Sequence, residues 1–359
     1  MKRILLPVAA LAILAACGGK SGQVVTPEPL SPAAELRLRL DSVVDAGKYL
    51  FGHHDDTAYG HTWEYEEGGS DVKAVTGEYP ALMSWDLGLI EVDSARNLDG
   101  VPFGFIRSQI AAQHARGGFN TISWHPINPA TRGNSWDTSV APLADSVMLD
   151  TLTVWIDRAA AFIASLKDAD GKPLPVIFRP WHENSGSWFW WGSGSATPEQ
   201  YIALYRLTRE RFDSAGIDNV LWAYSPDKDL TREQYLSTYP GDDYVDILGA
   251  DIYAFDGEEG IGQYTERVRA QLPMVVDEAR RRGKIAAFTE TGLEGLPVAD
   301  WYTRVLRPLT DSLGIAYVCV WRNGIQTQKP EHFYVPYPGH PSEADFRLYH
   351  DTSNALFVK

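Results

Sequence analysis

The chain has 359 residues, of which 44% are hydrophobic and 22% charged, as in ordinary globular proteins. This composition excludes a disordered or collagen-like chain, and the length allows either two average domains or one large α/β barrel. The 47 acidic residues against 32 Lys and Arg give a formal net charge of −15. Nucleic acid and anionic lipid are bound through clustered cations, so this charge argues against both as electrostatic partners.

The N-terminus predicts an export signal. Lys2 and Arg3 precede an apolar run that is too short to span a membrane. The run ends in Leu-Ala-Ala-Cys, which resembles a bacterial lipobox, so we expect residues 1–16 to be a lipoprotein signal peptide and Cys17 to carry a lipid. The alternative is an ordinary signal peptide with an incidental cysteine. Residues 17–34 are rich in Gly, Ser, Pro and Thr, which predicts a flexible tether.

The residues after Cys17 lack the acidic run that resembles surface-export signals. We therefore expect a cell-envelope lipoprotein of a Gram-negative bacterium that faces the periplasm rather than the cell surface. The lipid on Cys17 would be its contact with the membrane. Cys319 then remains as the one thiol, and its apolar surroundings predict buried packing rather than a nucleophile.

Eight apolar runs that end in polar residues follow in chain order. They are Tyr49–His53, Ala81–Asp86, Thr121–His125, Val176–Glu183, Val220–Ser225, Ile247–Tyr253, Ile285–Glu290 and Tyr317–Trp321. Near-continuous apolar runs are typical of parallel strands buried on both faces. Helical patterns alternate with them at Phe105–Arg116, Leu152–Lys167, Pro198–Ala215, Tyr264–Arg282 and Val298–Leu313.

This alternation predicts an α/β fold, a single (β/α)8 TIM barrel over residues 35–359. A doubly wound open sheet is the alternative, but no glycine-rich phosphate loop follows an early strand. Barrel chemistry lies at the carboxyl ends of the strands, and polar side chains gather at these ends. They include His53, His54, Asp55, Asp56, Asp86, His125, His182, Glu183, Asp227, Asp251, Glu290 and Arg322.

Glutamates follow the fourth and the seventh apolar run, which lie across the predicted barrel mouth from each other. Glu183 precedes a Trp-rich loop, and Glu290 precedes a turn glycine. Retaining glycoside hydrolysis needs two carboxyl groups about 5–5.5 Å apart, one protonated and one ionised. Arg179 and Tyr253 could keep the nucleophile ionised by hydrogen bonding. The alternative is that each glutamate is only a buried ion-pair partner.

Two stretches, His182–Gly192 and Phe288–Gly292, resemble glycoside hydrolase family 26, which contains many bacterial β-mannanases. Related barrel glycosidases usually have Asn before the acid/base, whereas this chain has His182, the family 26 form. Weaker motifs occur in the family's order, at Gly52–Asp55, Tyr79–Ala81 with Asp86, Ser123–Pro126, Asp251–Tyr253 and Trp321–Asn323. The resemblance covers most of residues 35–359.

The resemblance implies a role for each matching residue. Glu183 would be the acid/base and Glu290 the nucleophile. His182 would contact the sugar beside the cleaved bond and help to position Glu290. Trp188 would stack on the leaving-group sugar, and Tyr253 would donate a hydrogen bond to the nucleophile.

Further residues would bind the substrate, again by resemblance. Asp251 would lie behind Tyr253 and the nucleophile. Trp321 would form the floor under the reacting sugar, and Arg322 would reach the next sugar outward. His125 would bind a sugar on the non-reducing side, with Trp136 nearby.

Other polar and aromatic residues have plainer interpretations. The four-residue run His53–Asp56 could be a metal cluster, but neighbouring strand residues point to opposite faces, so we expect a structural or substrate-wall role and no metal site. Asp86 is expected either to bond across the mouth or to hold a loop, and Trp181, Trp190 and Trp191 to be mainly packing. Glu64–Glu67 is expected to be a solvated loop, and Gln328–Pro341 an ordered loop without a specific role.

The resemblance implies a retaining hydrolase of β-1,4-mannan, glucomannan or galactomannan. We expect endo action and a monomer, and no cofactor, because the two carboxyl groups suffice for the chemistry. Mixed-linkage β-glucan, β-1,3-xylan and exo-acting release of mannobiose remain open alternatives. A non-catalytic glycan-binding lipoprotein would keep the barrel but would not need the two glutamates. A barrel esterase or deacetylase would need a Ser-His-Asp set or a metal centre, and no Gly-x-Ser-x-Gly motif is present.

Overall fold

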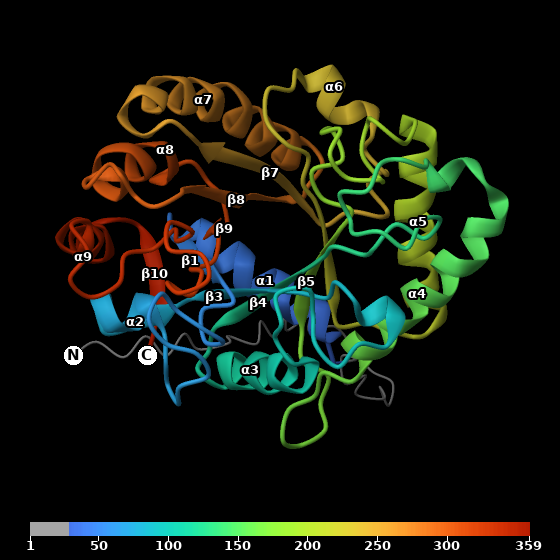
Figure 1. Cartoon of the computed structure of the whole chain (residues 1–359), viewed down its shortest axis with the longest axis horizontal. Coiled ribbons are helices and arrows are strands. Elements are labelled where there is room, and N and C mark those ends of the chain that lie inside the picture. The colour runs from blue at the N-terminus through green and yellow to red at the C-terminus, as the bar shows by residue number, and fades with distance from the viewer. Residues whose placement is uncertain (1–28) are drawn as a thin grey trace, which may run out of the picture. The chain divides into compact units, whose positions relative to one another are not determined.

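Eight parallel strands pair side by side and close into a barrel (Figure 1). The first barrel strand, β1, pairs with the last, β9, over Leu50–His53 and Tyr317–Val320. In chain order the strands are β1 (Tyr49–His54), β3 (Leu82–Asp86), β4 (Phe119–Trp124), β5 (Val176–Pro180), β6 (Val220–Tyr224), β7 (Ile247–Ala254), β8 (Ile285–Leu293) and β9 (Tyr317–Val320). All their residues are buried except Tyr253, as expected for strands covered on both faces. The predicted (β/α)8 barrel is confirmed.

The computed structural model, which describes residues 29–359, contains nine α-helices. They are α1 (Pro32–Asp45), α2 (Asp71–Thr76), α3 (Phe103–Ala115), α4 (Ser146–Ala164), α5 (Pro198–Ser214), α6 (Arg232–Ser237), α7 (Gly257–Arg281), α8 (Arg307–Thr310) and α9 (Glu343–Thr352). Four predicted helices correspond to α3, α4, α5 and α7. The pattern at Val298–Leu313 instead forms a π-helical turn, Tyr302–Leu306, followed by the short α8.

The tether prediction is wrong at its C-terminal end. Helix α1 begins at Pro32, because the Ser31 hydroxyl accepts a hydrogen bond from the Ala34 amide and proline suits the first helical turn. Residues 31–359 form one compact unit. The predicted signal peptide at 1–16, the lipid site at Cys17 and the tether up to residue 28 lie outside the described residues.

Two strands lie outside the predicted set. The C-terminal strand β10 (Ala355–Val358) pairs in parallel with β1 and antiparallel with the two-residue β2 (Tyr79–Pro80). Both are too short to stand out as apolar runs. Of the helices that the structure describes, none is long and apolar enough to cross a membrane.

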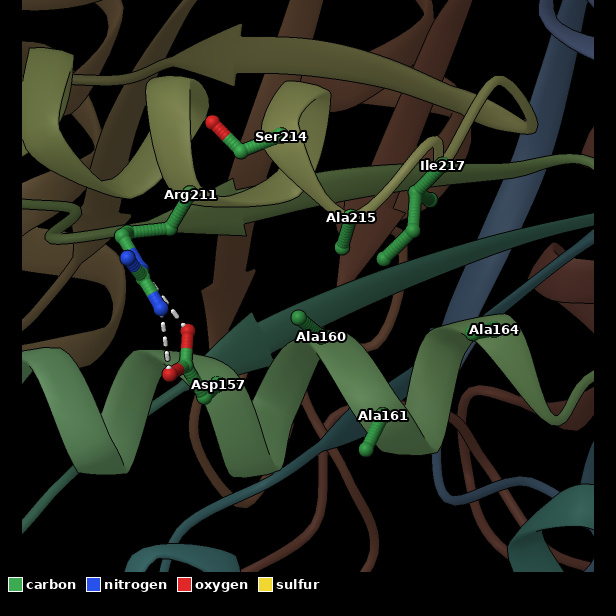
Figure 2. Close-up of a pocket in the computed structure, with 8 residues that line it drawn as sticks. All are labelled: Asp157, Ala160, Ala161, Ala164, Arg211, Ser214, Ala215 and Ile217. Atoms are coloured by element: carbon green, nitrogen blue, oxygen red, sulfur yellow. Dashed lines mark hydrogen bonds and ion pairs between the residues drawn. The ribbon is translucent and has the colours of Figure 1, made fainter.

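A surface hollow of about 470 Å³ lies between α4 and α5 (Figure 2). Its walls are mainly the small side chains of Ala160, Ala161, Ala164 and Ala215, and the exposed Arg211–Asp157 ion pair crosses its end at 2.6 Å. The alanines lie toward the C-terminal ends of the helices. In this fold those ends face away from the carboxyl ends of the strands, so the hollow does not belong to the barrel mouth.

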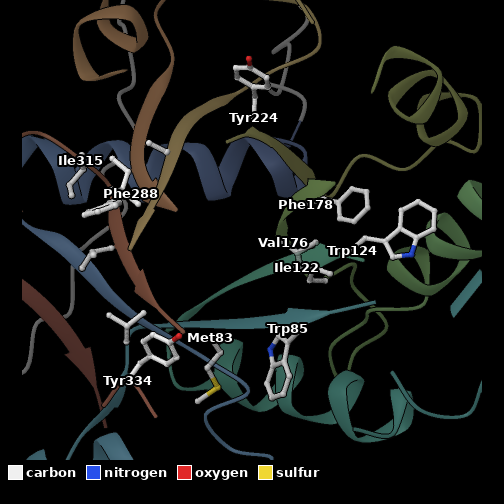
Figure 3. Packing of buried hydrophobic residues seen from close by; sticks show 14 of the residues in the cluster. Met83, Trp85, Ile122, Trp124, Val176, Phe178, Tyr224, Phe288, Ile315 and Tyr334 are labelled. Carbon is white, nitrogen blue, oxygen red and sulfur yellow. The ribbon is translucent and has the colours of Figure 1, made fainter. Parts of the chain in front are cut away.

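Two groups of buried side chains form the core. The larger group fills the space between barrel and helices and includes Trp85, Trp124 and Phe178 (Figure 3). Phe178 of β5 stacks on Phe212 of α5. The smaller group includes Leu36 and Leu40 of α1 and Cys319. Burial raises the pKa of the Cys319 thiol, which agrees with the predicted packing role. This packing leaves the carboxyl ends of the strands free to carry polar residues.

Candidate active site

Glu183 lies in a tight turn beyond the end of β5. The sequence predicted a strand up to Glu183, but β5 ends at Pro180, and both Trp181 and Glu183 have a left-handed backbone, with φ of 55° and 53°. Non-glycine residues adopt this conformation at a cost, and only where their surroundings hold it. Here the Glu183 amide donates to the Ser225 carbonyl at 2.8 Å, and the Trp191 indole donates to the His182 carbonyl at 2.8 Å.

The Trp-rich loop that follows supports this turn. Trp181, Trp190 and Trp191 are fully buried, so these three rings are packing and do not face substrate. Trp188 is half-buried, and its indole N–H donates to Oε2 of Glu183 at 2.8 Å. Gly186 lies directly against the Trp188 ring, where a Cβ atom would overlap it. The loop therefore fixes both the glutamate and the indole beside it.

Glu290 is held in a different way, inside strand β8. The pairing of β8 with β7 and with β9 shifts in register close to this residue, and such bulges re-aim side chains into active sites. The Arg179 guanidinium donates to Oε1 of Glu290, and the Tyr253 hydroxyl donates to Oε2 at 2.7 Å. Both contacts were predicted from the sequence. Arg179 also bonds to Oδ2 of Asp251 at 2.8 Å, which places Asp251 behind the nucleophile candidate as expected.

The two glutamates meet across the barrel mouth. Glu183, Asp251 and Glu290 each offer a carboxylate oxygen, and these oxygens all lie within 4.8 Å of one another. This spacing suits a retaining glycosidase, whose carboxyl groups are about 5–5.5 Å apart, rather than an inverting one, which leaves room for a water.

The environments separate the two carboxyl groups electrostatically. Burial raises the pKa of Glu183 well above its ordinary value, and the nearby charges of Glu290, Asp251 and Asp227 add to the increase. The hydrogen bond from Trp188 opposes it. Glu290 instead accepts from a guanidinium that stays charged, because the carboxylates around Arg179 outweigh its burial and raise its pKa. Of the two carboxyl groups, Glu183 is therefore the one whose surroundings favour a proton, whereas Glu290 lies against a fixed positive charge.

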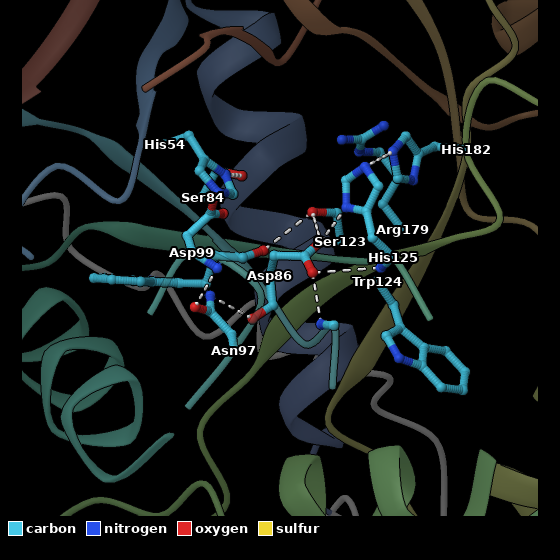
Figure 4. Close-up of polar contacts among 12 residues, drawn as sticks. His54, Ser84, Asp86, Asn97, Asp99, Ser123, Trp124, His125, Arg179 and His182 are labelled. Carbon is cyan, nitrogen blue, oxygen red and sulfur yellow. Dashed lines mark hydrogen bonds and ion pairs between the residues drawn. The ribbon is translucent and has the colours of Figure 1, made fainter. Parts of the chain in front are cut away.

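A network of buried polar side chains runs along the neighbouring strands (Figure 4). Oδ2 of Asp86 bonds to Nδ1 of His125 at 2.7 Å, and Nε2 of His125 lies 2.9 Å from Nε2 of His182. Asp86 also accepts from the Gly88 amide at 2.6 Å and from the Ser123 hydroxyl at 2.7 Å. Asp86 therefore both bonds across the mouth and holds a loop, which the sequence left as alternatives.

The charges around the two histidines determine which ring donates the hydrogen bond between them. Burial disfavours a charged His125, but the Asp86 carboxylate outweighs burial and raises the pKa of His125. Burial and the nearby Arg179 lower the pKa of His182 well below its ordinary value. These opposite shifts favour a proton on Nε2 of His125, with the unprotonated Nε2 of His182 as the acceptor and the ring proton of a neutral His182 on Nδ1. That Nδ1 is buried and has no hydrogen-bond partner within residues 29–359.

The remaining predicted residues at the barrel mouth differ in their exposure and in their contacts. Trp321 stacks on His54 with ring centroids 4.2 Å apart. Trp136 is 60% exposed and lies 5.0 Å from the Phe189 ring, so it stands at the rim. No hydrogen bond joins His182 to Glu290 among the described residues, because His182 turns to His125 instead. Its predicted contact with sugar stays a prediction.

Sequence reasoning missed the partners of Arg322. Its guanidinium bonds to the Tyr59 hydroxyl at 3.0 Å and to Asp99 at 2.8 Å. Asp99 lies in a loop after β3 with no motif around it, so no local signal marks it. Tyr59 in turn donates to Asp55 at 2.6 Å.

Two groups of side chains have the atoms of a cation site. The first is Glu183 with Asp251 and Glu290, and the second is His54 with Asp55 and Asp99. In each group a guanidinium already bonds to a member, Arg179 in the first and Arg322 in the second. The positive charge that the carboxylates require is thus supplied by the protein itself. His53 and Asp56 pair with each other at 2.7 Å, as a structural role predicts.

The model of glycosyl hydrolase family 26 matches residues 25–292, which include both glutamates. This chain belongs to glycoside hydrolase family 26. Family membership accounts for the barrel and for the order of the motifs at its strand ends.

Several curated proteins resemble the chain. A mannan endo-1,4-beta-mannosidase of Bifidobacterium adolescentis is 32% identical over 96% of this chain, which spans only 37% of that protein's length. A mannan endo-1,4-beta-mannosidase of Bacillus subtilis is 29% identical over 75% of this chain and 74% of its own length. An endoglucanase H of Acetivibrio thermocellus is 25% identical over 67% of this chain and 30% of its own length.

Solved structures agree with this assignment. A GH26 β-mannanase of Bacteroides ovatus superposes with a TM-score of 0.87 at 44% identity, over 91% of this chain and 95% of that one. A modular endo-β-1,4-mannanase of Cellulomonas fimi superposes with a TM-score of 0.79 at 32% identity, over 91% of this chain and 77% of that one.

Proposed function

We propose that the chain is a mannan endo-1,4-β-mannosidase, a retaining hydrolase of β-1,4-mannosidic bonds in mannan, glucomannan or galactomannan. The observation that carries the proposal is the pair of glutamates in unlike environments. Glu183 has a raised pKa, whereas Glu290 accepts hydrogen bonds from Arg179 and Tyr253. The family and the names of several relatives support mannan as the substrate.

The chemistry would proceed in two displacements. The Glu183 carboxyl gives its proton to the glycosidic oxygen while an Oε atom of Glu290 attacks the anomeric carbon. The bond to the leaving sugar breaks, and a glycosyl ester forms on Glu290. Glu183, now ionised, takes a proton from water, and that water releases the sugar with its original anomeric configuration.

Arg179 and Tyr253 would orient Glu290 before attack, and they would stabilise it again as the leaving carboxylate of the second step. Trp188 donates to Glu183 and would present its ring to the leaving-group sugar. Trp321, stacked on His54, would form the floor beneath the reacting sugar. Aromatic faces with a few placed polar groups suit a neutral polysaccharide.

A mixed-linkage β-glucan is the second candidate substrate, favoured by the similarity to an endoglucanase. The purified protein should be assayed on linear β-1,4-mannan and on mixed-linkage β-glucan, with wild type and Glu183→Ala in parallel. Mannan turnover that is lost in the variant is the expected result. Equal or faster turnover of the glucan would contradict the mannan assignment and keep the two-glutamate chemistry.

We also propose that the protein is a lipid-anchored envelope protein that faces the periplasm. The support is the Leu-Ala-Ala-Cys sequence that ends at Cys17, after a basic and apolar N-terminus. A Cys17→Ala variant should lose membrane fractionation and incorporation of labelled fatty acid. Removal of the wild-type protein from intact cells by external protease would contradict the periplasmic orientation.

A further inference from the structure

The short loop that follows β6 is held from both sides. The Asp227 amide donates to the Ser185 hydroxyl at 2.9 Å, and Ser185 lies two residues after Glu183. On the other side, the side chain of Gln271 in α7 donates to the Asp227 carbonyl at 2.9 Å and accepts from a second amide of the same loop at 3.1 Å. Gln271 is buried, so water does not compete for these bonds. The backbone of Lys228, within this loop, is therefore fixed beside the Glu183 turn.

The Lys228 ammonium group contacts two neighbours of Glu183. Its Nζ atom lies 3.1 Å from Oδ2 of Asp227 and 5.7 Å from the centroid of the Trp188 ring. The first contact is an ion pair, and the second lies within the range at which a cation is attracted to an indole face, about 6 Å. Only 24% of the lysine side chain is exposed. One cation thus joins a carboxylate and an aromatic ring from two different loops.

Both of these neighbours act on Glu183 directly. The Trp188 indole N–H donates to Oε2 of Glu183 at 2.8 Å. The Asp227 carboxylate is one of the negative charges that raise the pKa of Glu183. Loss of the Lys228 ammonium would therefore affect both the hydrogen bond that orients the Glu183 carboxyl and a charge that faces it.

The ion pair also determines how strongly Asp227 acts on Glu183. Burial raises the pKa of Asp227, and the Lys228 ammonium opposes this increase. Without the ammonium, an unpaired carboxylate would face Glu183, and an unpaired negative charge favours the protonated form of a neighbouring acid more than a paired one does. The other ionisable groups around Glu183 lie on β5, β7 and β8: Arg179, Asp251, Tyr253 and Glu290.

We propose that Lys228 is a positioning residue of the reaction, whose ammonium group holds Trp188 and Asp227 together and so orients Glu183 for proton donation. The inference rests on the proposed mannanase function. Lys228 contacts no reacting atom in this role. It acts through the indole that bonds to Glu183 and through the carboxylate whose charge it offsets.

The test removes the charge of Lys228 and keeps the length of its side chain. Lys228→Met is compared with wild type and with Lys228→Arg, which restores a cation. The matched control is Arg267→Met, because Arg267 bonds to Asp229 of the same loop at 3.0 Å and its side chain is also 24% exposed. kcat/KM is measured across pH on linear manno-oligosaccharides and on an aryl manno-oligoside, whose leaving group needs neither a proton nor a stacked sugar.

We expect kcat/KM of Lys228→Met on manno-oligosaccharides to fall by about fivefold, because a cation–π contact is lost, and to stay near the wild-type value on the aryl substrate. The alkaline limb on the oligosaccharides should move to higher pH, because a Glu183 with a higher pKa keeps its proton to a higher pH. Lys228→Arg should restore both the rate and the limb, and Arg267→Met should match wild type.

Three outcomes would overturn the Lys228 proposal while wild type turns over mannan normally. They are a wild-type rate and limb in Lys228→Met, an equal loss on both substrates with an unmoved limb, and a limb that moves to lower pH. The second of these is the result that a merely structural lysine would give. Absence of mannan turnover in wild type would instead contradict the proposed function, and the Lys228 proposal with it.

Discussion

Glu183 and Glu290 are the same residue type in two different surroundings, and the contrast shows how the barrel makes the two carboxyl groups differ. Glu290 lies within a strand and accepts from a buried guanidinium and a phenol. Glu183 lies in a strained turn past its strand and accepts from the indole of Trp188. One carboxyl faces fixed positive charge, and the other faces the negative charge of its partner.

The contrast has a physical lesson. Two carboxyl groups this close cannot ionise independently, so a cation placed beside one of them leaves the proton to the other. Arg179 is that cation, and it bonds to both Glu290 and Asp251. The acid and the nucleophile are therefore distinguished by their neighbours and not by their own chemistry.

The largest expected effect comes from removing each carboxyl in turn. Glu290→Ala should lower kcat on every substrate by about 10⁴-fold or more, as loss of a covalent nucleophile does. Glu183→Ala should lower it on mannan by about 10²–10⁴-fold, but far less on an aryl glycoside whose leaving group needs no proton. Steady-state rates on both substrate types measure the difference. Equal losses on the aryl glycoside would contradict the assigned roles.

The second largest effect is expected from removing the Arg179 guanidinium. Arg179→Ala leaves two carboxylates buried without their partner, which costs about 3–5 kcal/mol of unfolding free energy. Urea denaturation of the variant measures the loss. The control is Arg211→Ala, which breaks an exposed ion pair with Asp157 on the helical surface (Figure 2) and should change stability very little. Similar losses in the two variants would show that Arg179 is not the residue that organises the pair.

Asp86, His125 and His182 form the hydrogen-bonded network next to Glu183, so a change in this network tests how the surroundings of Glu183 are held. Asp86→Asn removes the charge that raises the pKa of His125, so His125 should lose its proton at a lower pH than in wild type. The His182 tautomer should then change at neutral pH, and kcat/KM should fall by up to about 100-fold through misplacement. Nitrogen chemical shifts of the two rings across pH report the tautomers. Unchanged shifts together with a lower rate would indicate a merely structural role for Asp86.

The smallest effect concerns the pH profile. Asp227 is one of the charges that raise the pKa of Glu183, so Asp227→Asn should move the alkaline limb of kcat to lower pH. The limb moves in this direction because the acid must be protonated to act, and an acid with a lower pKa loses its proton at a lower pH. Asp229→Asn, two residues away and paired with Arg267, is the control and should leave the limb in place. A shift to higher pH in Asp227→Asn would contradict the electrostatic account of Glu183.

Much of this arrangement could be predicted from the sequence. Eight apolar runs gave the barrel strands, since strands buried on both faces need continuous apolar residues. Glu183 and Glu290 stood out because carboxyl groups directly follow such runs. Arg179 and Tyr253 were expected to hold the nucleophile candidate, and the structure confirms both contacts.

Other features depend on contacts between distant segments. The end of β5 at Pro180 could not be predicted, because the left-handed turn around Glu183 is held by Ser225 and by the buried tryptophans. Asp99 is recognisable only through its contact with Arg322, more than 200 residues away. Helix α1 was obscured by the Pro- and Ser-rich composition of the segment in which it begins.

The assignment of Glu290 as nucleophile is tested most directly by trapping the covalent intermediate. Glu183→Ala is incubated with an activated 2-fluoro mannosyl glycoside, digested with trypsin and analysed by tandem mass spectrometry. The account predicts one added glycosyl group, on Glu290 within the peptide Ile285–Arg304. A label on Asp251 or on any other carboxyl group, or turnover with inversion and no label, would contradict it.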